Sequence, residues 1–257
     1  MALHLSPDHA RFAHDLAAAR LNGTTLDTAP PVATVAEAMA IQQGVLDAMA
    51  DRAAGWKISL HRDYGTLGGP LPAKLTGENG MALALPAPVA VEVEIAYRIG
   101  RDLAAGDHPD ETLLAALDGQ CVGVELVRPR LSGGTEPYLP YVADSNANEA
   151  YIAGPWQPVS AFDITAHPCR ITLDGAVFYE APTPLGQGEP FAVLRAAMRD
   201  ALATGGTLKA GAIITTGSRC GMVALPQRAG QEKPIRIKGK LLGLGAVEFH
   251  LTVSPRP

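Results

Sequence analysis

The sequence contains, at residues 91–99, the stretch Val91-Glu92-Val93-Glu94-Ile95-Ala96-Tyr97-Arg98-Ile99. Its β-branched and aromatic residues predict a β-strand. Because strand side chains alternate between the two faces of a sheet, Glu92 and Glu94 project to one face and the large apolar residues to the other. Two carboxylates are therefore expected to lie side by side on a strand that is otherwise apolar.

A third carboxylate, Glu125, lies in a second apolar stretch, Cys121-Val122-Gly123-Val124-Glu125-Leu126-Val127. Carboxylates buried together repel one another and lose their hydration, so a cation must neutralise them. Oxygen ligands without His or Cys favour Mg²⁺, Mn²⁺ or Ca²⁺ over Zn²⁺. We therefore expect Glu92, Glu94 and Glu125 to bind a divalent metal. The alternatives are a solvated Glu-x-Glu edge strand, or buried salt bridges to Lys or Arg that bind no ion.

Composition limits the function classes. The 257 residues are 47% hydrophobic, which is enough for one large domain with an ample core. The net charge of −5 comes without a basic cluster, so nucleic-acid binding is not expected. No apolar run approaches the roughly 20 residues that span a bilayer, and the N-terminus has no signal-like apolar core. Three widely spaced cysteines fit reduced thiols. We expect a cytoplasmic protein that does not associate with membranes.

Capping signals predict two helices at the N-terminus. Ser6 and Pro7 begin the first, which ends at Asn22-Gly23. The second begins near Thr34, whose capping-box partner is Glu37, and is expected to continue to about residue 54, where Gly55 stops it. We therefore predict an N-terminal helical subregion over residues 1–55 and a β-rich catalytic domain over residues 56–257.

Short apolar runs separated by turn residues dominate the second part of the chain. Helices are expected at about residues 109–117 and 190–204, and a surface loop at 181–189. Residues 171–179 predict a hairpin, because Asp174-Gly175 suits the positive φ angles of a tight turn. A second hairpin is expected from residues 235–241 and 246–253. The predicted fold class is α+β, a mixed and curved β-structure with helices packed around it.

Two segments supply candidate catalytic groups. Lys57 is a cation in a stretch that otherwise reads as a core strand, Gly55-Trp56-Lys57-Ile58. Its stem could reach the surface, or its ammonium could lie near the acids and bind a substrate carboxylate or transfer protons. His61 and Asp63 follow in a polar loop, where His61 is a candidate acid or base or simply a solvated loop histidine.

Two further segments are candidates for substrate binding. Residues 144–149 are rich in short polar side chains, which is typical of a turn but also offers Asp144 and Asn146 as ligands for substrate. The corner at Thr216-Gly217 could bind an anionic oxygen through backbone N–H and hydroxyl groups.

Together these residues resemble 2-keto-4-pentenoate hydratases and the related 4-oxalocrotonate decarboxylases of the fumarylacetoacetate hydrolase superfamily. The resemblance runs from about Arg11 to Val253. Its motifs are Gly55-Trp56-Lys57-Ile58, Val91-Glu92-Val93-Glu94-Ile95-Ala96, Arg101-Asp102-Leu103, Gly123-Val124-Glu125-Leu126, Val142-Ala143-Asp144 and Leu208-Lys209-Ala210-Gly211 through Thr216-Gly217. The resemblance implies a mixed β-sandwich roll of the fumarylacetoacetate hydrolase type with a helical N-terminal part. It also implies homo-oligomers built from dimers and Mg²⁺ or Mn²⁺ bound by Glu92, Glu94 and Glu125.

The resemblance further implies a chemistry. A small 2-oxo or enol acid would chelate the metal through its carboxylate and C2 oxygen, and Lys57 would assist. Addition of water to a 2-hydroxy-2,4-dienoate would give a 4-hydroxy-2-oxo acid, as in the breakdown of aromatic compounds. The alternatives are decarboxylation of an oxalocrotonate-type acid, hydrolysis of an acylpyruvate, and a non-catalytic protein that binds 2-oxo acids.

The chain departs from the family pattern at two places. Asp63-Tyr64-Gly65 matches a family Asp-x-Gly motif but follows Lys57 almost immediately, so the lid segment is short. In residues 144–149, Ala147 stands where the family often has serine, and Glu149 replaces a small residue. These departures predict a changed polar contact and a pocket that closes differently around its substrate.

Overall fold

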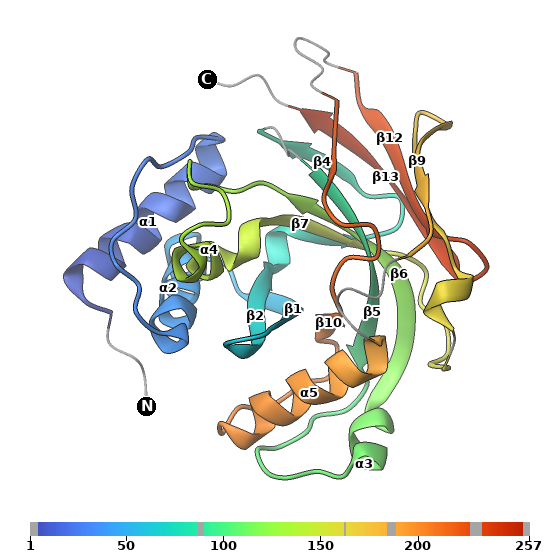
Figure 1. Cartoon of the computed structure of the whole chain (residues 1–257), viewed down its shortest axis with the longest axis horizontal. Helices are drawn as coiled ribbons and strands as arrows, with labels where there is room; N and C mark the ends of the chain where they lie inside the picture. The colour runs from blue at the N-terminus through green and yellow to red at the C-terminus, as the bar shows by residue number, and fades with distance from the viewer. Residues whose placement is uncertain (1–4, 87–89, 162, 184–188, 227–232, 254–257) are drawn as a thin grey trace.

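Two β-sheets pack face to face, and helices cover one end and one edge (Figure 1). The computed structural model describes residues 5–86, 90–161, 163–183, 189–226 and 233–253. Within these ranges one sheet has eight strands in the order β2-β1-β10-β5-β6-β7-β3, with β11 paired to β5, and the other has five in the order β4-β13-β12-β8-β9. This architecture confirms the predicted α+β fold, a mixed β-sandwich roll with a helical N-terminal part.

The larger sheet mixes parallel and antiparallel neighbours. Its strands are β1 (Ala53–His61), β2 (Gly65–Pro72), β3 (Thr76–Glu78), β5 (Ala90–Ile99), β6 (Leu117–Val127), β7 (Asn148–Ala153), β10 (Ile213–Thr215) and β11 (Val223–Ala224). The strands of the smaller sheet are β4 (Ala82–Leu85), β8 (Cys169–Leu173), β9 (Ala176–Ala181), β12 (Ile235–Leu241) and β13 (Gly245–Val253). The helices are α1 (Pro7–Asn22), α2 (Val35–Ala48), α3 (Asp110–Leu114), α4 (Tyr138–Ala143) and α5 (Pro190–Ala203). Short 3-10 segments lie at Ala73–Leu75, Ser145–Ala147 and Ile164–Ala166.

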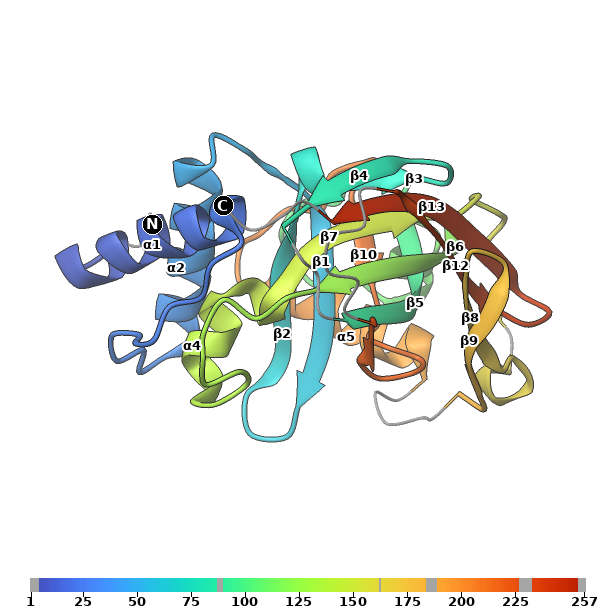
Figure 2. The ribbon, with the colours of Figure 1, turned by 90° about the horizontal axis from the view of Figure 1, so that it is seen from above.

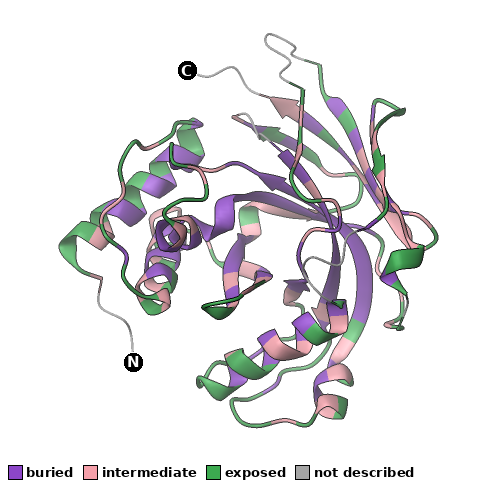
Figure 3. Ribbon diagram, in the orientation of Figure 1, coloured by how far each residue is buried: buried purple, intermediate pink, exposed green. Residues whose placement is uncertain are grey.

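The main core lies between the two sheets. Val91, Val93 and Ile95 of β5 are fully buried and belong to one cluster with Ile237 of β12 and Phe249 of β13. The buried surface continues along β5, β6 and β7 (Figure 3). Because strand side chains alternate, the other face of β5 and β6 is left for the glutamates. The predicted two-faced pattern of residues 91–97 is therefore confirmed.

Helices α1 and α2 lie at one end of the molecule, beside α4 (Figure 2). The predicted caps are present: Ser6 accepts a hydrogen bond from the His9 backbone, and Thr34 and Glu37 form a capping box. The apolar faces of these helices share a core with Leu67 of β2 and Val142 of α4. The helical end is thus packed directly against the segment that leads into residues 144–149.

Two predicted helix boundaries are wrong. The second helix ends at Ala48 rather than near residue 54, and Ala50 has a positive φ of 48°. Residues 53–61 form β1 instead, because pairing with β2 and β10 outweighs the helix propensity of the alanines. Gly55 does not stop a helix; it lies in β1, where a Cβ atom would come within 2.0 Å of the Ile213 carbonyl oxygen. The helix expected at residues 109–117 is the short α3, and Leu117 already belongs to β6.

The other local predictions agree with the structure. β8 and β9 form the hairpin around Asp174 and Gly175, whose φ angles are 51° and 90°. β12 and β13 form the second hairpin, and α5 closely matches the helix expected at residues 190–204. Residues 184–188 of the expected loop lie outside the described residues. None of the described helices is both long and apolar enough to cross a bilayer.

Candidate metal centre

Three glutamates converge on the face of the larger sheet that points away from the smaller sheet. In the antiparallel ladder of β5 and β6, Glu92 pairs directly with Glu125, and Glu94 pairs with Gly123. Each glutamate has a carboxylate oxygen within 4.8 Å of one from each of the other two. Glu94 and Glu125 are completely buried, and the Glu92 side chain is 12% exposed. Like charges opposite one another destabilise a ladder, so this arrangement needs a compensating partner.

The absence of a side chain at Gly123 leaves space for the Tyr151 side chain, which packs on the face that carries the glutamates. A Cβ atom at Gly123 would come within 2.0 Å of the Tyr151 hydroxyl oxygen. Tyr151 of β7 is fully buried, and it pairs with Glu125 across the β6–β7 ladder. Burial raises the pKa of the Tyr151 hydroxyl, and nearby Glu94 raises it further. Tyr151 therefore stays neutral, and its hydroxyl is buried near the acids without a hydrogen-bond partner among the described residues.

Lys57 lies among the acids. β10 pairs with β1 on one side and with β5 on the other, and its register puts Lys57 on the same face of the sheet as Glu92 and Glu94. The Lys57 ammonium donates to Glu125 Oε1 at 2.7 Å and to the Asn146 carbonyl at 3.2 Å, and lies 3.8 Å from Glu92. Burial alone would lower the pKa of Lys57, but Glu125 and Glu92 outweigh it and raise the pKa. Lys57 is consequently held as a cation.

Lys57 and the more weakly acting charge of the buried Arg219, which also lowers the pKa of Glu94, do not neutralise three carboxylates. Neither carboxylate oxygen of Glu94 makes a well-formed hydrogen bond within the described part of the chain, although the Thr215 hydroxyl is nearby, and Oε2 of Glu125 is also without a partner there. Burial raises the pKa of Glu94 to about 7 and that of Glu125 to about 8, although Lys57 lowers both. Desolvation therefore penalises their charged forms.

These residues fit a divalent cation. Carboxylate oxygens that converge from two strands, several of them buried without a partner in the described ranges, are the donor set that Mg²⁺, Mn²⁺ and Ca²⁺ prefer. A dication would supply the charge that Lys57 cannot, and the partial exposure of Glu92 would leave one side of the group open to solvent. The geometry thus allows an ion with free coordination positions.

Two residues of this site were not predicted from the sequence. The Asn148 side chain donates to Glu125 Oε1 at 3.0 Å, and the Tyr141 hydroxyl donates to the Asn146 carbonyl at 3.1 Å. Asn148 lies within the polar segment at residues 144–149, so its side chain could have been considered. Tyr141 precedes that segment in an apolar stretch, and no local pattern marks it.

Asp144 and Asn146, the expected substrate ligands, occupy other roles in the structure. Asp144 is buried, and both of its carboxylate oxygens accept hydrogen bonds from Arg130. Asn146 contacts Lys57 through its backbone carbonyl rather than through its side chain. The Asn146 side chain amide points toward the Ser59 hydroxyl at 3.5 Å. Asp144 therefore has no free carboxylate oxygen to offer a ligand here, whereas Asn146 remains next to the acids.

His61 and Asp63 are not brought into contact with the glutamates in this structure. His61 ends β1 and stacks on the Tyr138 ring at a centroid distance of 4.3 Å. Asp63 lies in the β1–β2 turn with a side chain that is 69% exposed, and its ion-pair partner is Arg62. Both therefore lie at the outer end of the strand that carries Lys57.

The corner at Thr216-Gly217 follows β10. The backbone N–H and the hydroxyl of Thr216 both donate to the Ile95 carbonyl, at 3.1 and 3.0 Å. Gly217 has a φ of 83°, which glycine adopts without strain. The Thr216 donors thus fasten the corner to β5, next to Glu94, and any anion at this corner would have to use other N–H groups.

Comparison with known proteins agrees with this architecture. Residues 72–250, more than half of the chain, match the family described as Fumarylacetoacetate (FAA) hydrolase C-terminal. Over 162 residues the chain is 27% identical to a 4-oxalocrotonate decarboxylase of Pseudomonas sp, covering 63% of this chain and 60% of that protein. Over 150 residues it is 32% identical to a 2-keto-4-pentenoate hydratase of Burkholderia vietnamiensis, covering 56% of each. The matches thus span less than two thirds of the length of these curated relatives.

Solved structures show the same fold over a larger part of the chain. A 4-oxalocrotonate decarboxylase from Pseudomonas putida G7, complexed with magnesium and adipate, superposes with a TM-score of 0.78 at 18% identity, covering 96% of this chain and 99% of that one. A fumarylpyruvate hydrolase from Pseudomonas aeruginosa, in complex with Mn²⁺ and pyruvate, has a TM-score of 0.54 at 17% identity, covering 77% and 89%. The family match, the sheet topology and the position of the three glutamates lead to one assignment: this chain belongs to the fumarylacetoacetate hydrolase family.

Proposed function

We propose that this protein is a divalent-metal-dependent hydratase that adds water to a 2-hydroxy-2,4-dienoate (2-oxo-4-pentenoate) and forms a 4-hydroxy-2-oxo acid. The observation that carries the proposal is the buried group of Glu92, Glu94 and Glu125, whose charge Lys57 offsets only in part. The hydratase relative, at 32% identity, supports this choice of reaction.

Glu92, Glu94 and Glu125 would hold the ion. When bound, a divalent cation supplies Lewis-acid stabilisation for negative charge that develops on a 2-oxo acid. Mg²⁺ or Mn²⁺ is our choice, because the group consists of carboxylates alone. Among similar folds, one structure is described with magnesium and another with Mn²⁺.

Lys57 acts in this scheme as a hydrogen-bond donor and not as a base. Glu125 and Glu92 raise its pKa, so the ammonium keeps its proton at neutral pH. A charged donor beside the metal ligands would hold a substrate carboxylate or C2 oxygen and oppose the charge that forms there during ketonisation. His61 and Asp63 remain our candidates for moving protons at the far end of the substrate, which requires them to approach it when the substrate binds.

The first assay follows the loss of dienoate absorbance with Mg²⁺ present, after chelation, and with Mn²⁺ restored. We expect activity to require the ion and to be nearly abolished in Glu92→Gln, with a 4-hydroxy-2-oxo acid as the product. Activity that is indifferent to both the chelator and the substitution would refute the proposal. Titration calorimetry with Mg²⁺ tests the ion site without reference to turnover.

The second candidate reaction is decarboxylation of a 4-oxalocrotonate-type acid, which the 27% identical relative favours. Release of CO₂ from that acid, without hydration of the monoacid dienoate, would select it. Cleavage of an acylpyruvate to pyruvate would indicate a hydrolase. Metal-dependent binding of oxalate without turnover of any of these acids would indicate a non-catalytic binding protein. Our expectation of a homo-oligomer built from dimers can be tested by light scattering.

A further inference from the structure

Three consecutive residues near the acids have an unusual backbone. Ser145, Asn146 and Ala147 have φ angles of 53°, 50° and 59°, in the left-handed region that non-glycine residues avoid. All three side chains are buried. None of them is glycine, so the surrounding structure must impose this conformation. We call residues 145–147 the left-handed turn.

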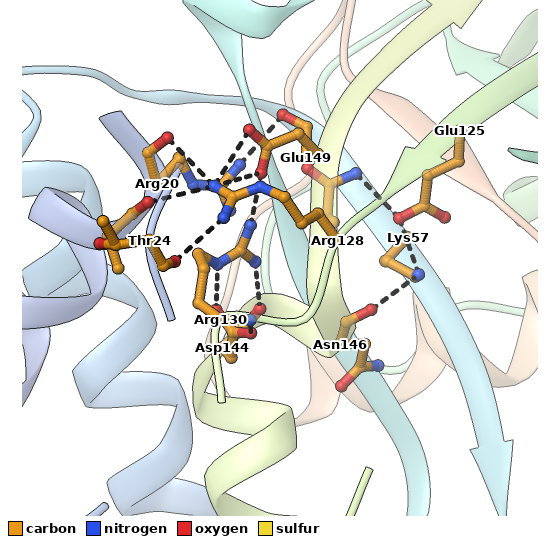
Figure 4. A network of polar contacts seen from close by, with 11 residues as sticks. Arg20, Thr24, Lys57, Glu125, Arg128, Arg130, Asp144, Asn146 and Glu149 are labelled. Carbon is orange, nitrogen blue, oxygen red and sulfur yellow. Dashed lines mark hydrogen bonds and ion pairs between the residues drawn. The ribbon is translucent and has the colours of Figure 1, made fainter. Parts of the chain in front are cut away.

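The residues that flank the left-handed turn are held by one arginine. Asp144 precedes the turn and Glu149 follows it closely. The Arg130 guanidinium donates to the Asp144 carboxylate, to the Asp144 carbonyl at 2.8 Å and to Glu149 Oε2 at 2.7 Å, while the Arg130 backbone N–H donates to Asp144 Oδ2 at 2.8 Å. Figure 4 shows Arg130 between these two acids. The two ends of the turn are therefore tied to a single side chain.

Two further arginines connect this group to the end of helix α1. Arg128 donates to the carbonyls of Ala19 and Arg20 at 3.2 and 3.1 Å, and contacts Glu149 at 3.3 Å. Arg20 in turn donates to the Glu149 carbonyl at 3.0 Å. Cations are favourable at the C-terminal end of a helix, where carbonyl groups lack helical partners. We call Arg20, Arg128, Arg130, Asp144 and Glu149 the arginine cluster (Figure 4).

The arginine cluster is costly to bury. Burial lowers the pKa of Arg20 to about 9 and raises the pKa of Asp144, although Arg130 acts in the opposite direction on Asp144. A buried network of this kind is poor evidence for added stability, because well-packed apolar residues often do as well. What the network supplies, and apolar residues would not, is a fixed set of hydrogen-bonded positions for Asp144 and Glu149.

The left-handed turn connects the arginine cluster to the candidate metal centre through hydrogen bonds. The Asn146 carbonyl accepts hydrogen bonds from the Lys57 ammonium and the Tyr141 hydroxyl, and Asn148, the next residue after the turn, donates to Glu125. On its other side the turn lies close to β2, where a Cβ atom at Gly69 would come within 2.8 Å of the Ser145 carbonyl oxygen. A small shift of the turn would therefore move a partner of Lys57 and a partner of Glu125 together.

We infer that Arg130, Asp144 and Glu149 are positioning residues that hold the left-handed turn so that Asn146 and Asn148 fix the orientation of Lys57 and Glu125. The end of helix α1 takes part through Arg128 and Arg20. The effect on turnover rests on the proposed function, whereas the effect on Lys57 itself does not. None of these residues needs to touch the substrate.

The test compares Asp144→Asn and Glu149→Gln with wild-type protein. Each substitution keeps the size of the side chain and weakens its contact with Arg130. We expect Lys57 to react several-fold faster with acetic anhydride, as read by peptide mass spectrometry, and residues 143–150 to exchange amide hydrogens faster. We also expect kcat to fall about 10-fold to 100-fold with little change in KM, because misplaced catalytic groups slow chemistry more than binding.

Two control variants separate positioning from lost stability. Val45→Ala removes packing between α1 and α2 and should lower the melting temperature without changing the labelling rate of Lys57. Asp118→Asn removes a carboxylate on β6 that pairs with Arg98 of β5, and should change neither quantity appreciably. If Asp144→Asn does not fold, Glu149→Gln carries the test, because it leaves the contact between Arg130 and Asp144 intact.

Wild-type labelling of Lys57 in a folded Asp144→Asn or Glu149→Gln variant would overturn the inference, as would faster labelling in Val45→Ala to the same extent. A protein that hydrates no dienoate but shows the expected labelling and exchange would contradict the proposed function and leave the positioning role supported. The two proposals can therefore fail separately.

Discussion

Two buried groups of charges lie next to each other in this protein and are balanced in opposite ways. In the arginine cluster, both carboxylates have each oxygen hydrogen-bonded to an arginine, and there are more cations than anions. In the metal centre, Glu92, Glu94 and Glu125 outnumber the cations Lys57 and Arg219, and buried oxygens are left without partners among the described residues. Burial is costly in both places. The protein supplies the compensating charge itself in the first group, and in the second it leaves a position that suits a ligand.

The largest effect should come from removing the central cation of the arginine cluster. Arg130→Met leaves Asp144 and Glu149 buried beside weaker partners, so we expect the free energy of unfolding to fall by about 3–5 kcal/mol. Denaturant titration at neutral pH measures this loss. An unfolding free energy equal to that of the wild type would show that the two groups do not differ in the way described.

The opposite sign is expected in the metal centre. Glu94→Gln removes a buried charge that lacks adequate compensation, so the metal-free protein should gain about 1–3 kcal/mol of unfolding free energy at pH 8. Its affinity for Mg²⁺ should fall by at least about ten-fold, because a ligand is lost. Denaturant titration after chelation, together with calorimetry, checks both. A loss of stability in the metal-free variant would mean that Glu94 is already well paired.

The pH dependence of stability should differ between the metal-free protein and the protein with bound Mg²⁺. Burial raises the pKa of Glu94 and Glu125 from 4.5 to about 7 and about 8, so in that interval the folded chain binds more protons than the unfolded chain. The stability of the chelated protein should therefore fall as pH rises from about 5 to about 8. Bound Mg²⁺ should remove most of this decrease. Melting temperatures measured across this range with and without the ion test the sign.

The smallest effect is expected for an ion pair that is not buried. Asp118→Asn breaks the contact with Arg98 at 2.7 Å, but 46% of the Asp118 side chain is exposed. Solvent and salt screen such pairs, so the melting temperature should change little, and less still at high salt. A loss comparable to that of Arg130→Met would contradict the view that burial decides the energetic weight of these charges.

Local sequence patterns predicted much of the fold but misplaced two helix boundaries, one of them for an instructive reason. The helix caps at Ser6 and Thr34 and the Asp174-Gly175 turn depend on residues close in the chain, and the structure has all of them. The end of the second helix depends on β1 pairing with β2 and β10, strands that follow later in the sequence. Alanine-rich residues before Gly55 favour a helix locally, and this distant pairing overrides them.

The candidate site likewise has some features that local sequence predicts and others that depend on the pairing of distant strands. Strand alternation alone indicates that Glu92 and Glu94 share a face. Their meeting with Glu125 depends on the β5–β6 register, and the arrival of Lys57 depends on β10 lying between β1 and β5. Nothing near Asp144 in the sequence indicates that Arg130 occupies its carboxylate. The sequence predicts residues 144–149 as a turn that also offers Asp144 and Asn146 to a substrate, and in the structure Asp144 and Glu149 both contact Arg130.

The sequence by itself determined the elements whose signals are local: the two-faced strand with its paired acids, the capped helices, the hairpins and the resemblance to the fumarylacetoacetate hydrolase family. Only the tertiary structure decided which buried charges are paired and which are left for a ligand. The physical reason is that periodicity and capping act between residues a few positions apart. Compensation of a buried charge depends on side chains that strand order brings together from distant parts of the chain, as it does for Lys57 and Glu125.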